Sequence, residues 1–467
     1  MIFDNVKNIY MMGICGTAMG SMAGILQSMG FVVSGSDQNV YPPISTMLHD
    51  LGIEIKIGYK PENLSPKPDL VIVGNVMSRS NEEVQALLDS DIPYTSLAKA
   101  MGELVIGKRN SIVCSGTHGK TTTTSMFAWV MDYLGHDPGF MVGGIPKNYE
   151  TSFSKGGGDY FVIEGDEYDT AFFDKVPKFN HYKPKYVVLN GIEFDHADIY
   201  EDIGEVVSAF KGLLSRIPKD GILLYKGNDK NIESILTQSN AKRNCSFGDS
   251  DSDYHHRNIS YNQNYCFFDA YKKNELLVKI KIATFGLYNV WNATAVVGMC
   301  NELGFDLEKV ADALRTYEGV KRRQELIVQK GDVKVYEDFA HHPTAVGLTV
   351  EAMKDRFGSQ RLICLFEPRS ATSRRKIFQK AYVEAFKKSD LCYIAEPFNQ
   401  DKIPLEDRFS TEELIADLRA NGVNASMFKN ARDVVKKIKH DLREDDKIVV
   451  MSNGGFDGIY DLLREQI

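Results

Sequence analysis

The sequence predicts an α/β protein built from three tandem α/β domains. At roughly 150 residues per domain, a chain of 467 residues should form several hydrophobic cores. Short β-rich runs alternate with helix-period segments along the chain, which is typical of parallel sheets with crossover helices. The composition, 43% hydrophobic and 25% charged, is that of a globular chain. We expect domains over residues 1–107, 108–318 and 319–467.

The first predicted domain is Rossmann-like. Its β-rich runs are residues 9–12, 31–34 and 70–73. Gly13, Gly16 and Thr17 follow the first run, and such a glycine turn lets a helix N-terminus approach a diphosphate. Asp37 follows the second run and is a candidate to bond a ribose or a base. Taken alone, this loop would fit a dinucleotide such as NAD equally well.

The second and third predicted domains continue the α/β pattern. Residues 259–285 alternate in polarity with no helix between them, as expected of antiparallel strands at a sheet edge. We therefore expect a P-loop ATPase-like central domain with an added antiparallel sheet, then a Rossmann-like C-terminal domain. Apolar spacing over residues 377–386 predicts one buried helical face. The β-rich runs are residues 111–114, 160–163, 186–189, 222–225, 333–336, 361–366, 391–394 and 447–451.

The strongest chemical motif lies between a β-rich run and a helical pattern. Its residues are Gly116, Thr117, His118, Gly119, Lys120, Thr121 and Thr122. The backbone N–H groups of such a loop bind phosphate, with Lys120 reaching the β and γ oxygens and Thr121 ligating Mg²⁺. The motif is shorter than the full P-loop pattern, because Cys114 stands where that pattern has glycine. The alternative is a helix start that binds nothing.

Acidic and imidazole side chains follow the neighbouring β-rich runs. Glu164 ends one run and is the candidate second oxygen ligand of a magnesium nucleotide. His196 follows the next run, near the same edge of a parallel sheet. A lone histidine is more often a structural hydrogen-bonding residue, but the flanking acids favour a metal ligand. The predicted metal ligands are Thr121, Glu164 and His196, and the predicted catalytic residues are Lys120 and His196.

Together these motifs resemble those of the Mur ligase family. Its members are ATP-dependent, amide-forming, three-domain ligases of peptidoglycan metabolism. The resemblance runs from Gly13 to Gly458 with the motifs in family order. It implies ATP and Mg²⁺ as cofactors, and a UDP-sugar bound by Gly13, Gly16, Thr17 and Asp37. The motifs that carry it are GTHGKTT at 116–122, EGDEYD at 164–169, FDHAD at 194–198, YNVWNATA at 288–295 and YEDFAHHPT at 336–344.

The resemblance also assigns nucleotide contacts outside the loop. Asn289 and Asn292 match the family's HNxxN pair at adenine, with Tyr288 in the histidine position. An amide side chain can both donate to and accept from a base edge, although either asparagine could instead cap the helix that starts here. Closure of the third domain over ATP is implied by three further matches. These are Arg323, Asp338 and His341.

Within the family, the chain most resembles ligases that join UDP-N-acetylmuramate to the murein tripeptide L-alanyl-γ-D-glutamyl-meso-diaminopimelate in peptidoglycan recycling. The reason is the run EPRSATSR at 367–374, where ligases that add L-alanine to the same UDP-muramate have QPHRYTR. Arg369 could pair with a peptide carboxylate, or form a surface ion pair only. The implied peptide-binding residues are Arg369, Ser370, Ser452 and Asn453. The alternatives are an L-alanine ligase of de novo synthesis and a non-enzymatic, nucleotide-gated sensor.

Charge and composition argue against several other classes of partner. The net charge of −8 gives no electrostatic footprint for nucleic acid. No stretch approaches ~20 uninterrupted apolar residues, so we expect no membrane span. The cysteines are scattered singly along the chain, which fits a reducing cytoplasm. The second phosphate loop, at residues 116–122, argues against a dehydrogenase, which would not need it. The sequence leaves open the oligomeric state and the arrangement of the domains. It also leaves open whether the third amino acid of the peptide is diaminopimelate or lysine. Lys211 follows His196 by fifteen residues, a spacing at which some relatives have a carbamylated lysine, and its carbamylation is open too.

Overall fold

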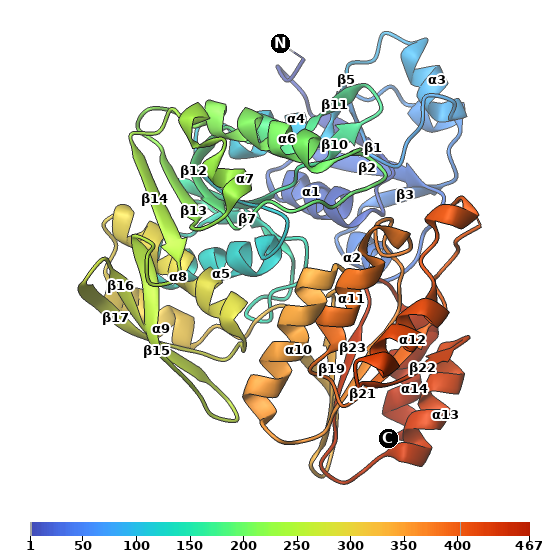
Figure 1. The fold of residues 1–467 in the computed structure, drawn as a ribbon. Coiled ribbons are helices and arrows are strands. Elements are labelled where there is room, and N and C mark those ends of the chain that lie inside the picture. The colour runs from blue at the N-terminus through green and yellow to red at the C-terminus, as the bar shows by residue number, and fades with distance from the viewer. Residues whose placement is uncertain (1, 402) are drawn as a thin grey trace. The chain divides into compact units, whose positions relative to one another are not determined.

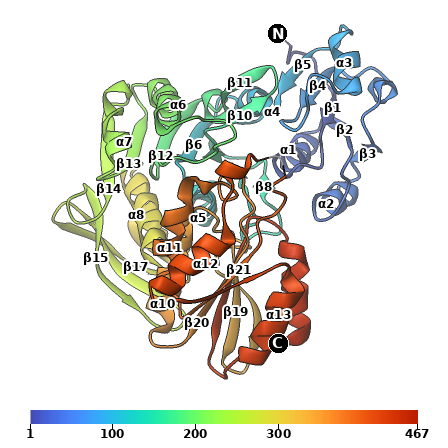
Figure 2. The same ribbon diagram turned by 45° about the vertical axis from the view of Figure 1, so that its right-hand side comes forward.

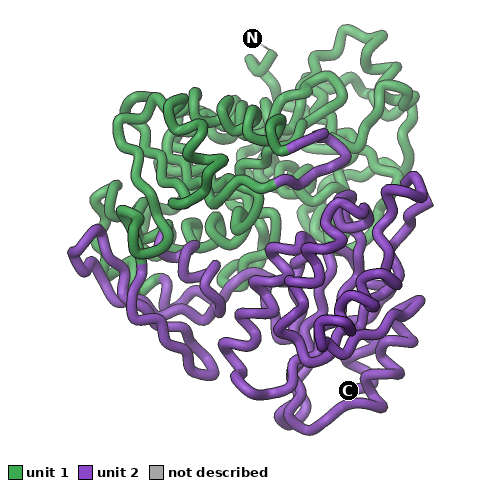
Figure 3. The backbone as a smooth tube through the Cα atoms, in the orientation of Figure 1, with its two compact units in different colours: residues 1–193, 203–255, 295–313 green, residues 194–202, 256–294, 314–467 purple. Residues whose placement is uncertain are grey.

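The computed structural model describes residues 2–401 and 403–467, and Figure 1 shows its fold. Contacts divide the chain into two compact units, coloured separately in Figure 3. The first unit comprises residues up to Glu193, Ile203–His255 and Ala295–Ala313, and the second comprises Phe194–Asp202, His256–Thr294 and Leu314–Ile467. The predicted central domain, residues 108–318, is divided between the two units. The predicted domain boundaries remain predictions.

The N-terminal part of the first unit is an all-parallel sheet with crossover helices. Its strands are β1 (Asn8–Met12), β2 (Val32–Asp37), β3 (Glu54–Ile57), β4 (Leu70–Val73) and β5 (Tyr94–Ser96). Its helices are α1 (Thr17–Ser28), α2 (Ile44–Asp50), α3 (Glu82–Leu88) and α4 (Leu97–Ala100). The strand order is β3-β2-β1-β4-β5, so the winding reverses at β1. Ligands of such sheets bind at the carboxyl ends of the strands beside this switch point.

The rest of the first unit is built on a second, mostly parallel sheet. Its strands are β6 (Asn110–Ser115), β7 (Gly139–Met141), β8 (Phe153–Ser154), β9 (Tyr160–Gly165), β12 (Pro184–Leu189), β13 (Ile222–Lys226) and β14 (Arg243–Gly248). Its helices are α5 (Lys120–Tyr133), α6 (Ile203–Arg216) and α7 (Lys230–Glu233), and a hairpin is formed by β10 (Asp169–Ala171) and β11 (Asp174–Pro177). β6 lies between β9 and β12, with Ser115 opposite Gly165 and Leu189. The residues that follow these three strands therefore meet at one edge.

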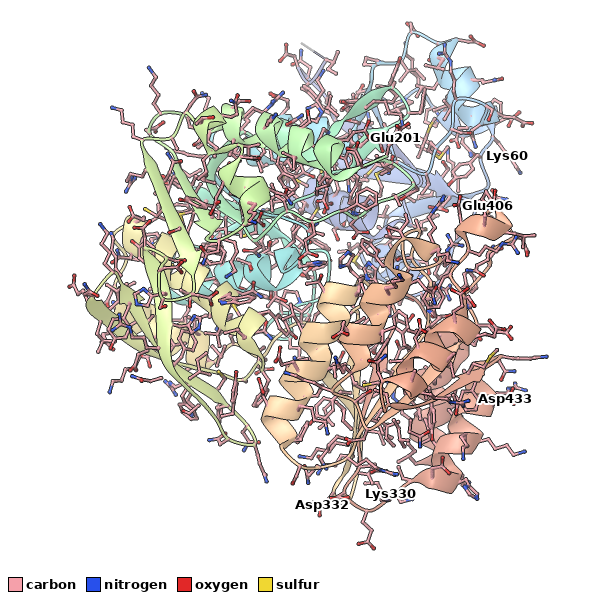
Figure 4. All side chains as sticks on the ribbon, viewed as in Figure 1. Lys60, Glu201, Lys330, Asp332, Glu406 and Asp433 are labelled. Atoms are coloured by element: carbon pink, nitrogen blue, oxygen red, sulfur yellow. The ribbon has the colours of Figure 1, made fainter. Side chains whose placement is uncertain are left out.

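The C-terminal part of the second unit is a mixed sheet covered on both faces. Its strands are β18 (Glu325–Lys330), β19 (Val333–Asp338), β20 (Leu362–Phe366), β21 (Leu391–Ala395), β22 (Asn424–Phe428) and β23 (Lys447–Met451). The order is β18-β19-β23-β20-β21-β22, and only β18 is antiparallel. Lys330, the last residue of β18, and Asp332, in the turn before β19, are labelled in Figure 4.

Side chains of these strands point alternately into two hydrophobic layers. Cys364 and Phe366 of β20 pack in one layer, and Ile363 and Leu365 pack in the other. The first layer is covered by α10 (Pro343–Phe357), α11 (Gln379–Phe386) and α12 (Thr411–Ala420). The second is covered by α13 (Ala431–Asp441) and α14 (Ile459–Gln466). Figure 2 shows α10, α11 and α12 on one side of this sheet and α13 on the other.

The strands expected over residues 259–285 are present and follow β14 along the chain. They are β15 (Tyr254–Tyr261), β16 (Cys266–Lys272) and β17 (Glu275–Ile282), and α8 (Leu287–Glu302) and α9 (Leu307–Arg315) follow them. β16 lies beside β15 and pairs antiparallel with β17. The predicted fold class of three α/β parts is confirmed, and β15, β16 and β17 form one edge of the central ten-stranded sheet. No helix among the described residues has the length and apolar character to cross a membrane.

One sequence-based detail is wrong. The spacing over residues 377–386 predicts a single buried face, but Ile377 is 53% exposed and Ala381 is also exposed. For Ile377 the reason is that α11 begins only at Gln379, after a short 3₁₀ turn at Lys376–Phe378. This turn has a different periodicity from an α-helix, so residues on its two sides do not share a face. Tyr382 and Phe386 are buried as expected.

Candidate functional site

The loop between β6 and α5 has the backbone of a phosphate-binding turn. Gly116 has φ +120° and Gly119 has φ +79°, conformations that favour glycine. A Cβ at Gly116 would lie 2.8 Å from the Gly191 oxygen, so only glycine fits against the loop after β12. The Thr117 amide donates to this oxygen at 2.9 Å. The first amides of α5 thus stand at a fixed, glycine-lined helix N-terminus, which is a favourable position for an anion.

Lys120 forms a buried ion pair at this loop. Its Nζ donates to the Gly116 oxygen at 2.8 Å and to the Glu167 carboxylate at 2.8 and 3.2 Å. The side chains of Lys120 and Glu167 are 12% and 2% exposed. Burial lowers the pKa of Lys120, but the charges of Glu167 and Asp166 outweigh it, and the net pKa is raised. The ammonium group is therefore kept positively charged beside the helix N-terminus.

Thr121 and Glu164 present oxygen atoms next to this lysine. The Thr121 hydroxyl donates to Glu164 Oε2 at 3.0 Å, and the Gly143 amide donates to Oε1. Burial, then the nearby charge of Asp166, raises the pKa of Glu164. A partly buried carboxylate beside a hydroxyl is a donor set that suits a hard divalent cation such as Mg²⁺, whose positive charge would also favour the ionised carboxylate.

Sequence reasoning selected Glu164 and missed its acidic neighbours. Asp166 accepts from Lys178 Nζ at 3.1 Å, and Glu167 accepts from Lys120. Burial raises the pKa of Asp166, but Lys178 and Lys120 outweigh burial and hold it below its usual value. The signal was present in the run EGDEYD, where several acids follow one strand. A strand end can face only a few partners, and the sequence does not show which acid reaches which lysine.

The glycine loop after β1 lies against β2. The amides of Gly13 and Ile14 donate to the Ser36 oxygen at 2.8 and 3.1 Å, and Gly13 has φ +78°. Asp37, 6% exposed, accepts from the Cys15 amide at 2.9 Å. The carboxylate predicted to bond a ribose or base is thus also a brace for the loop. Gly16 is the N-cap of α1, which Thr17 begins.

In the second unit, the segment Phe194–Asp202 carries His196. This residue has φ +55°, which is unusual for a residue other than glycine. Its amide donates to Asp195 Oδ1 at 2.7 Å, and Thr372 donates its hydroxyl to the same oxygen at 2.7 Å. Burial alone would raise the pKa of Asp195, but the imidazoles of His196, His341 and His342 outweigh it and hold the pKa well below its usual value.

The predicted ATP contacts of the second unit gather around the end of β19. Asp338, 3% exposed, accepts from the amides of Gln324 and Ala340 at 2.9 and 2.8 Å. Burial raises its pKa, and the charge of Arg323 opposes that rise. Arg323 lies over the Phe339 ring at 4.7 Å. The ring of His341 contacts the Phe339 oxygen through Nδ1 at 3.0 Å.

The two predicted adenine residues lie inside α8 and are not its N-cap. Asn289 is 4% exposed, and its Nδ2 donates to the Phe285 oxygen at 2.8 Å. Gln324 donates to that same oxygen at 3.1 Å and to the Tyr288 hydroxyl at 2.6 Å. Gln324, which sequence reasoning missed, therefore joins the start of α8 to the Arg323 segment. Asn292 is also buried and donates to Asn289 Oδ1 at 3.4 Å.

The predicted peptide residues meet at the carboxyl ends of β20 and β23. Buried Glu367 accepts from the Ser452 hydroxyl at 2.6 Å and from Arg369 at 3.2 Å. Arg369 lies over the Phe398 ring at 3.8 Å. Ser370 donates its hydroxyl to Ser373 at 2.9 Å, and Asn453 Oδ1 is buried with no hydrogen-bond partner among the described residues. Glu367 was missed as a site residue because its strand-end position resembles that of a structural acid.

Each unit thus brings part of the predicted site together. The first unit holds the residues predicted for the phosphates, one metal and the UDP-sugar. These are Gly13, Gly16, Thr17, Asp37, Gly116, Thr117, His118, Gly119, Lys120, Thr121, Thr122 and Glu164. The second unit holds the remaining predicted residues. These are His196, Asn289, Asn292, Arg323, Asp338, His341, Arg369, Ser370, Ser452 and Asn453.

The three α/β parts and the lysine-bearing phosphate loop define an enzyme of the ATP-dependent ligase class. The chain belongs to the Mur ligase family, and as a member it is an ATP-dependent amide ligase, as predicted. The model described as "Mur ligase family, catalytic domain" matches residues 8–109. "Mur ligase middle domain" matches 114–300, and "Mur ligase, glutamate ligase domain" matches 322–454.

Full-length relatives include ligases with two different acceptors. UDP-N-acetylmuramate–L-alanyl-γ-D-glutamyl-meso-2,6-diaminoheptandioate ligase of Escherichia coli is 36% identical over 98% of this chain and 97% of its own. UDP-N-acetylmuramate–L-alanine ligase of Clostridium tetani is 32% identical over 96% of each chain. A solved murein peptide ligase of Psychrobacter arcticus has a TM-score of 0.71 at 33% identity, over 98% of each chain. The UDP-N-acetylmuramate–alanine ligase of Thermotoga maritima shares the fold, with TM-score 0.81 at 23% identity over 99% of each chain.

Proposed function

We propose that this protein joins the lactyl carboxylate of UDP-N-acetylmuramate to the amine of the tripeptide L-alanyl-γ-D-glutamyl-meso-diaminopimelate, as in peptidoglycan recycling. The observation that carries the proposal is the 36% identity to the E. coli tripeptide ligase over nearly the whole of both chains. The similarity to the C. tetani L-alanine ligase is weaker, at 32%. A location in the reducing cytoplasm is part of the proposal.

The residues at the carboxyl ends of β20 and β23 support a substrate larger than L-alanine. Arg369 places a guanidinium group at a strand end, where it can pair bidentately with a carboxylate. Glu367 lies beside it, and the unpartnered Asn453 oxygen can accept from a peptide N–H. The tripeptide carries several carboxylates and a second amino group, whereas L-alanine has only the groups next to the reacting nitrogen. We propose Arg369, Ser370, Ser452 and Asn453 as peptide-binding residues.

The reaction we propose forms the amide in two steps. A lactyl carboxylate oxygen attacks the γ-phosphorus of ATP, which forms an acyl phosphate and releases ADP. The uncharged amine of the peptide then attacks the acyl carbon, the C–O bond to phosphate breaks, and the nitrogen loses a proton. Crowded negative charge opposes the first step. Lys120 and the N-terminus of α5 supply fixed positive charge where the phosphates would bind.

We assign the metal to Thr121 and Glu164, whose oxygens fit it, and propose that His196 contributes to a second metal. Bound Mg²⁺ would neutralise phosphate charge. For the remaining nucleotide contacts we propose Asn289, Asn292, Arg323, Asp338 and His341. The UDP-sugar is proposed to bind at Gly13, Gly16 and Thr17, with Asp37 bracing the loop or touching the ligand.

Parallel phosphate-release assays test the proposal. Purified protein receives ATP, Mg²⁺ and UDP-N-acetylmuramate with the tripeptide in one reaction and with L-alanine in the other. We expect turnover with the tripeptide and little with L-alanine, and identification of the UDP-linked product by mass confirms amide formation. A Lys120→Ala variant gives the background rate. Robust turnover with L-alanine alone would favour the alternative acceptor, and ATP binding without any amide product would favour a sensor.

A further inference from the structure

The segment Phe194–Asp202 belongs by covalent connection to the ATP-binding part of the chain, but it packs with the C-terminal part. The chain leaves the first unit after Glu193 and re-enters it at Ile203. Between these points the segment contacts the loop 367–375 that follows β20, here named the peptide loop, which holds the proposed peptide-binding residues Arg369 and Ser370. Glu201, labelled in Figure 4, is an exposed residue of this segment.

Thr372 makes the contact between this loop and the segment. Its hydroxyl donates to Asp195 Oδ1 at 2.7 Å and accepts from the Ala197 amide at 3.5 Å. The hydroxyl therefore bonds the residues on both sides of His196. Thr372 is 3% exposed, so water competes little for these bonds.

The peptide loop holds Thr372 in a defined turn. The Arg375 amide donates to the Thr372 oxygen at 3.0 Å. The Ser373 amide donates to the Ser370 hydroxyl at 3.0 Å, and the Arg374 amide donates to the Ser370 oxygen at 3.2 Å. A displacement of Ser370 or Arg369 by a bound peptide would thus be transmitted to Thr372 through short, local bonds.

The unusual backbone conformation of His196 lies directly beside this contact. A φ of +55° is unfavourable for a residue with a Cβ, and it persists only where surrounding bonds impose it. The Asp195 oxygen that accepts from Thr372 also accepts from the His196 amide. A second contact holds the start of the segment, where His342 Nε2 lies 3.2 Å from the Phe194 oxygen.

We propose that Thr372 is a positioning residue that couples the peptide loop to His196 through Asp195. This role rests on the proposed function of His196 and of the peptide loop. Thr372 touches neither substrate nor metal in this scheme. It holds the backbone of His196 in the arrangement needed for the reaction, and it makes that arrangement sensitive to the state of the peptide loop.

The test compares Thr372→Val, which keeps the shape and removes the hydroxyl, with Thr372→Ser, which keeps the hydroxyl. Thr411→Val is the matched control, because Thr411 is a buried threonine of the same unit whose hydroxyl donates to the Ala395 oxygen. Amide hydrogen exchange of residues 194–202 is measured in the protein without ligands. We expect Thr372→Val to accelerate exchange in this segment about tenfold or more, since a bond to a charged group is lost. Thr372→Ser should retain slow exchange, and Thr411→Val should match the wild type.

Steady-state kinetics with the tripeptide provide the second readout. Thr372→Val should lower kcat by roughly tenfold to a hundredfold, with the KM for the tripeptide within about threefold of the wild type. Thr372→Ser should recover most of kcat. If the wild type does not use the tripeptide, the proposed function fails, while the exchange experiment still tests the contact.

Three results would overturn the inference. The first is that Thr372→Val leaves both the exchange rate and kcat unchanged. The second is that Thr411→Val shows the same faster exchange and lower kcat as Thr372→Val. The third is that Thr372→Val raises only the KM for the tripeptide, which would make Thr372 a peptide-binding residue. If Thr372→Val does not fold, Asp195→Ala replaces it, because alanine removes the acceptor oxygen, with faster exchange at 194–202 as the required result. When both fold, the double variant should be no worse than the poorer single variant, because both changes disrupt one bond.

Discussion

Lys120 of the phosphate loop is paired with Glu167, with Nζ 2.8 Å from Oε2, and both side chains are largely buried. The lysine that we assign to the phosphates of ATP is therefore already ion-paired with a carboxylate of the run EGDEYD. Phosphate oxygens entering the loop would share or replace this partner. The ion pair keeps an otherwise costly buried cation compatible with the folded protein when no nucleotide is bound.

We predict that Glu167→Gln destabilises the protein mainly in the absence of nucleotide. The variant leaves the Lys120 ammonium with the Gly116 oxygen but without its buried counter-ion. Loss of one partner of a buried pair costs about 3–5 kcal/mol, and bound triphosphate should restore much of it by supplying negative charge. Denaturant unfolding with and without magnesium ATP measures the difference.

Asp220→Asn serves as the control for this prediction. Asp220 pairs with Lys185 at 3.2 Å, but its side chain is 72% exposed. An exposed pair contributes little to stability, and nucleotide should not alter its effect. An equal loss of stability in Glu167→Gln with and without ATP would show that the phosphates do not reach Lys120.

The sequence predicts the fold more completely than the site, for a physical reason. Strands such as β4 and β20 are continuous apolar runs, and their burial on both faces can be read from residue type alone. The glycine turn at Gly116 is likewise local in sequence. The partner of Lys120 is 47 residues away, and that of Asp195 is 177 residues away. Such pairs depend on how strand ends meet, which a single sequence does not specify.

The grouping of residues 194–202 with the C-terminal part shows the same limit. The run FDHAD predicts functional chemistry after a strand, but nothing in its pattern indicates which neighbour it packs against. Thr372 in EPRSATSR has no distinguishing feature as a residue type. Its importance appears only when the hydroxyl is found 2.7 Å from Asp195.

We predict that Gly116→Ala abolishes nucleotide binding and destabilises the protein. The added Cβ meets the Gly191 oxygen at 2.8 Å, and φ +120° is strained for alanine. Backbone movement that relieves this contact must displace the loop amides that would bind phosphate. We expect a loss of roughly 2–4 kcal/mol in unfolding free energy, from strain and overpacking together, measured by urea denaturation alongside an ATP-binding titration.

Gly30→Ala separates conformational strain from the steric clash. Gly30 also has positive φ, +97°, but a Cβ there meets nothing within 4 Å. We expect about 1–2 kcal/mol of destabilisation and normal ATP binding. If both variants lose the same stability and both bind ATP, the close approach of Gly116 to Gly191 has no functional meaning.

We predict a pH-dependent contribution to stability from Glu83. This carboxyl, 0% exposed, accepts from the Tyr10 and Ser36 hydroxyls at 2.6 and 2.8 Å. Burial raises its pKa above the ordinary value, and the two hydrogen bonds oppose that rise. Because the folded-state pKa is the higher one, the stabilisation is complete below the unfolded-state pKa and is lost as pH rises through the folded-state pKa.

Glu83→Gln should remove this dependence, since an amide does not ionise. The unfolding free energy of the wild type minus that of the variant should fall as pH rises above the unfolded-state glutamate pKa of about 4.3, measured by urea unfolding at several pH values. Asp91→Asn, at an exposed ion pair with Lys67, is the control and should show no such fall. A difference that grows with pH would mean that the folded protein favours the ionised carboxylate.

We predict that Asp174 fixes the hairpin β10–β11 to the N-terminal sheet. Asp174 of β11 accepts from the Ser96 hydroxyl at 2.6 Å and lies 2.9 Å from His181 Nε2. Phe173 of the same turn packs edge-on against Tyr94 at 5.1 Å. We expect Asp174→Asn to lower the unfolding free energy by about 1–3 kcal/mol, because a partly buried acceptor of two bonds loses its charge. Asp169→Asn, in the same hairpin but paired with the exposed Lys175, should cost no more than about 1 kcal/mol. Equal effects of the two substitutions would contradict the view that Asp174 fixes the hairpin to the N-terminal sheet, since only Asp174 contacts Ser96.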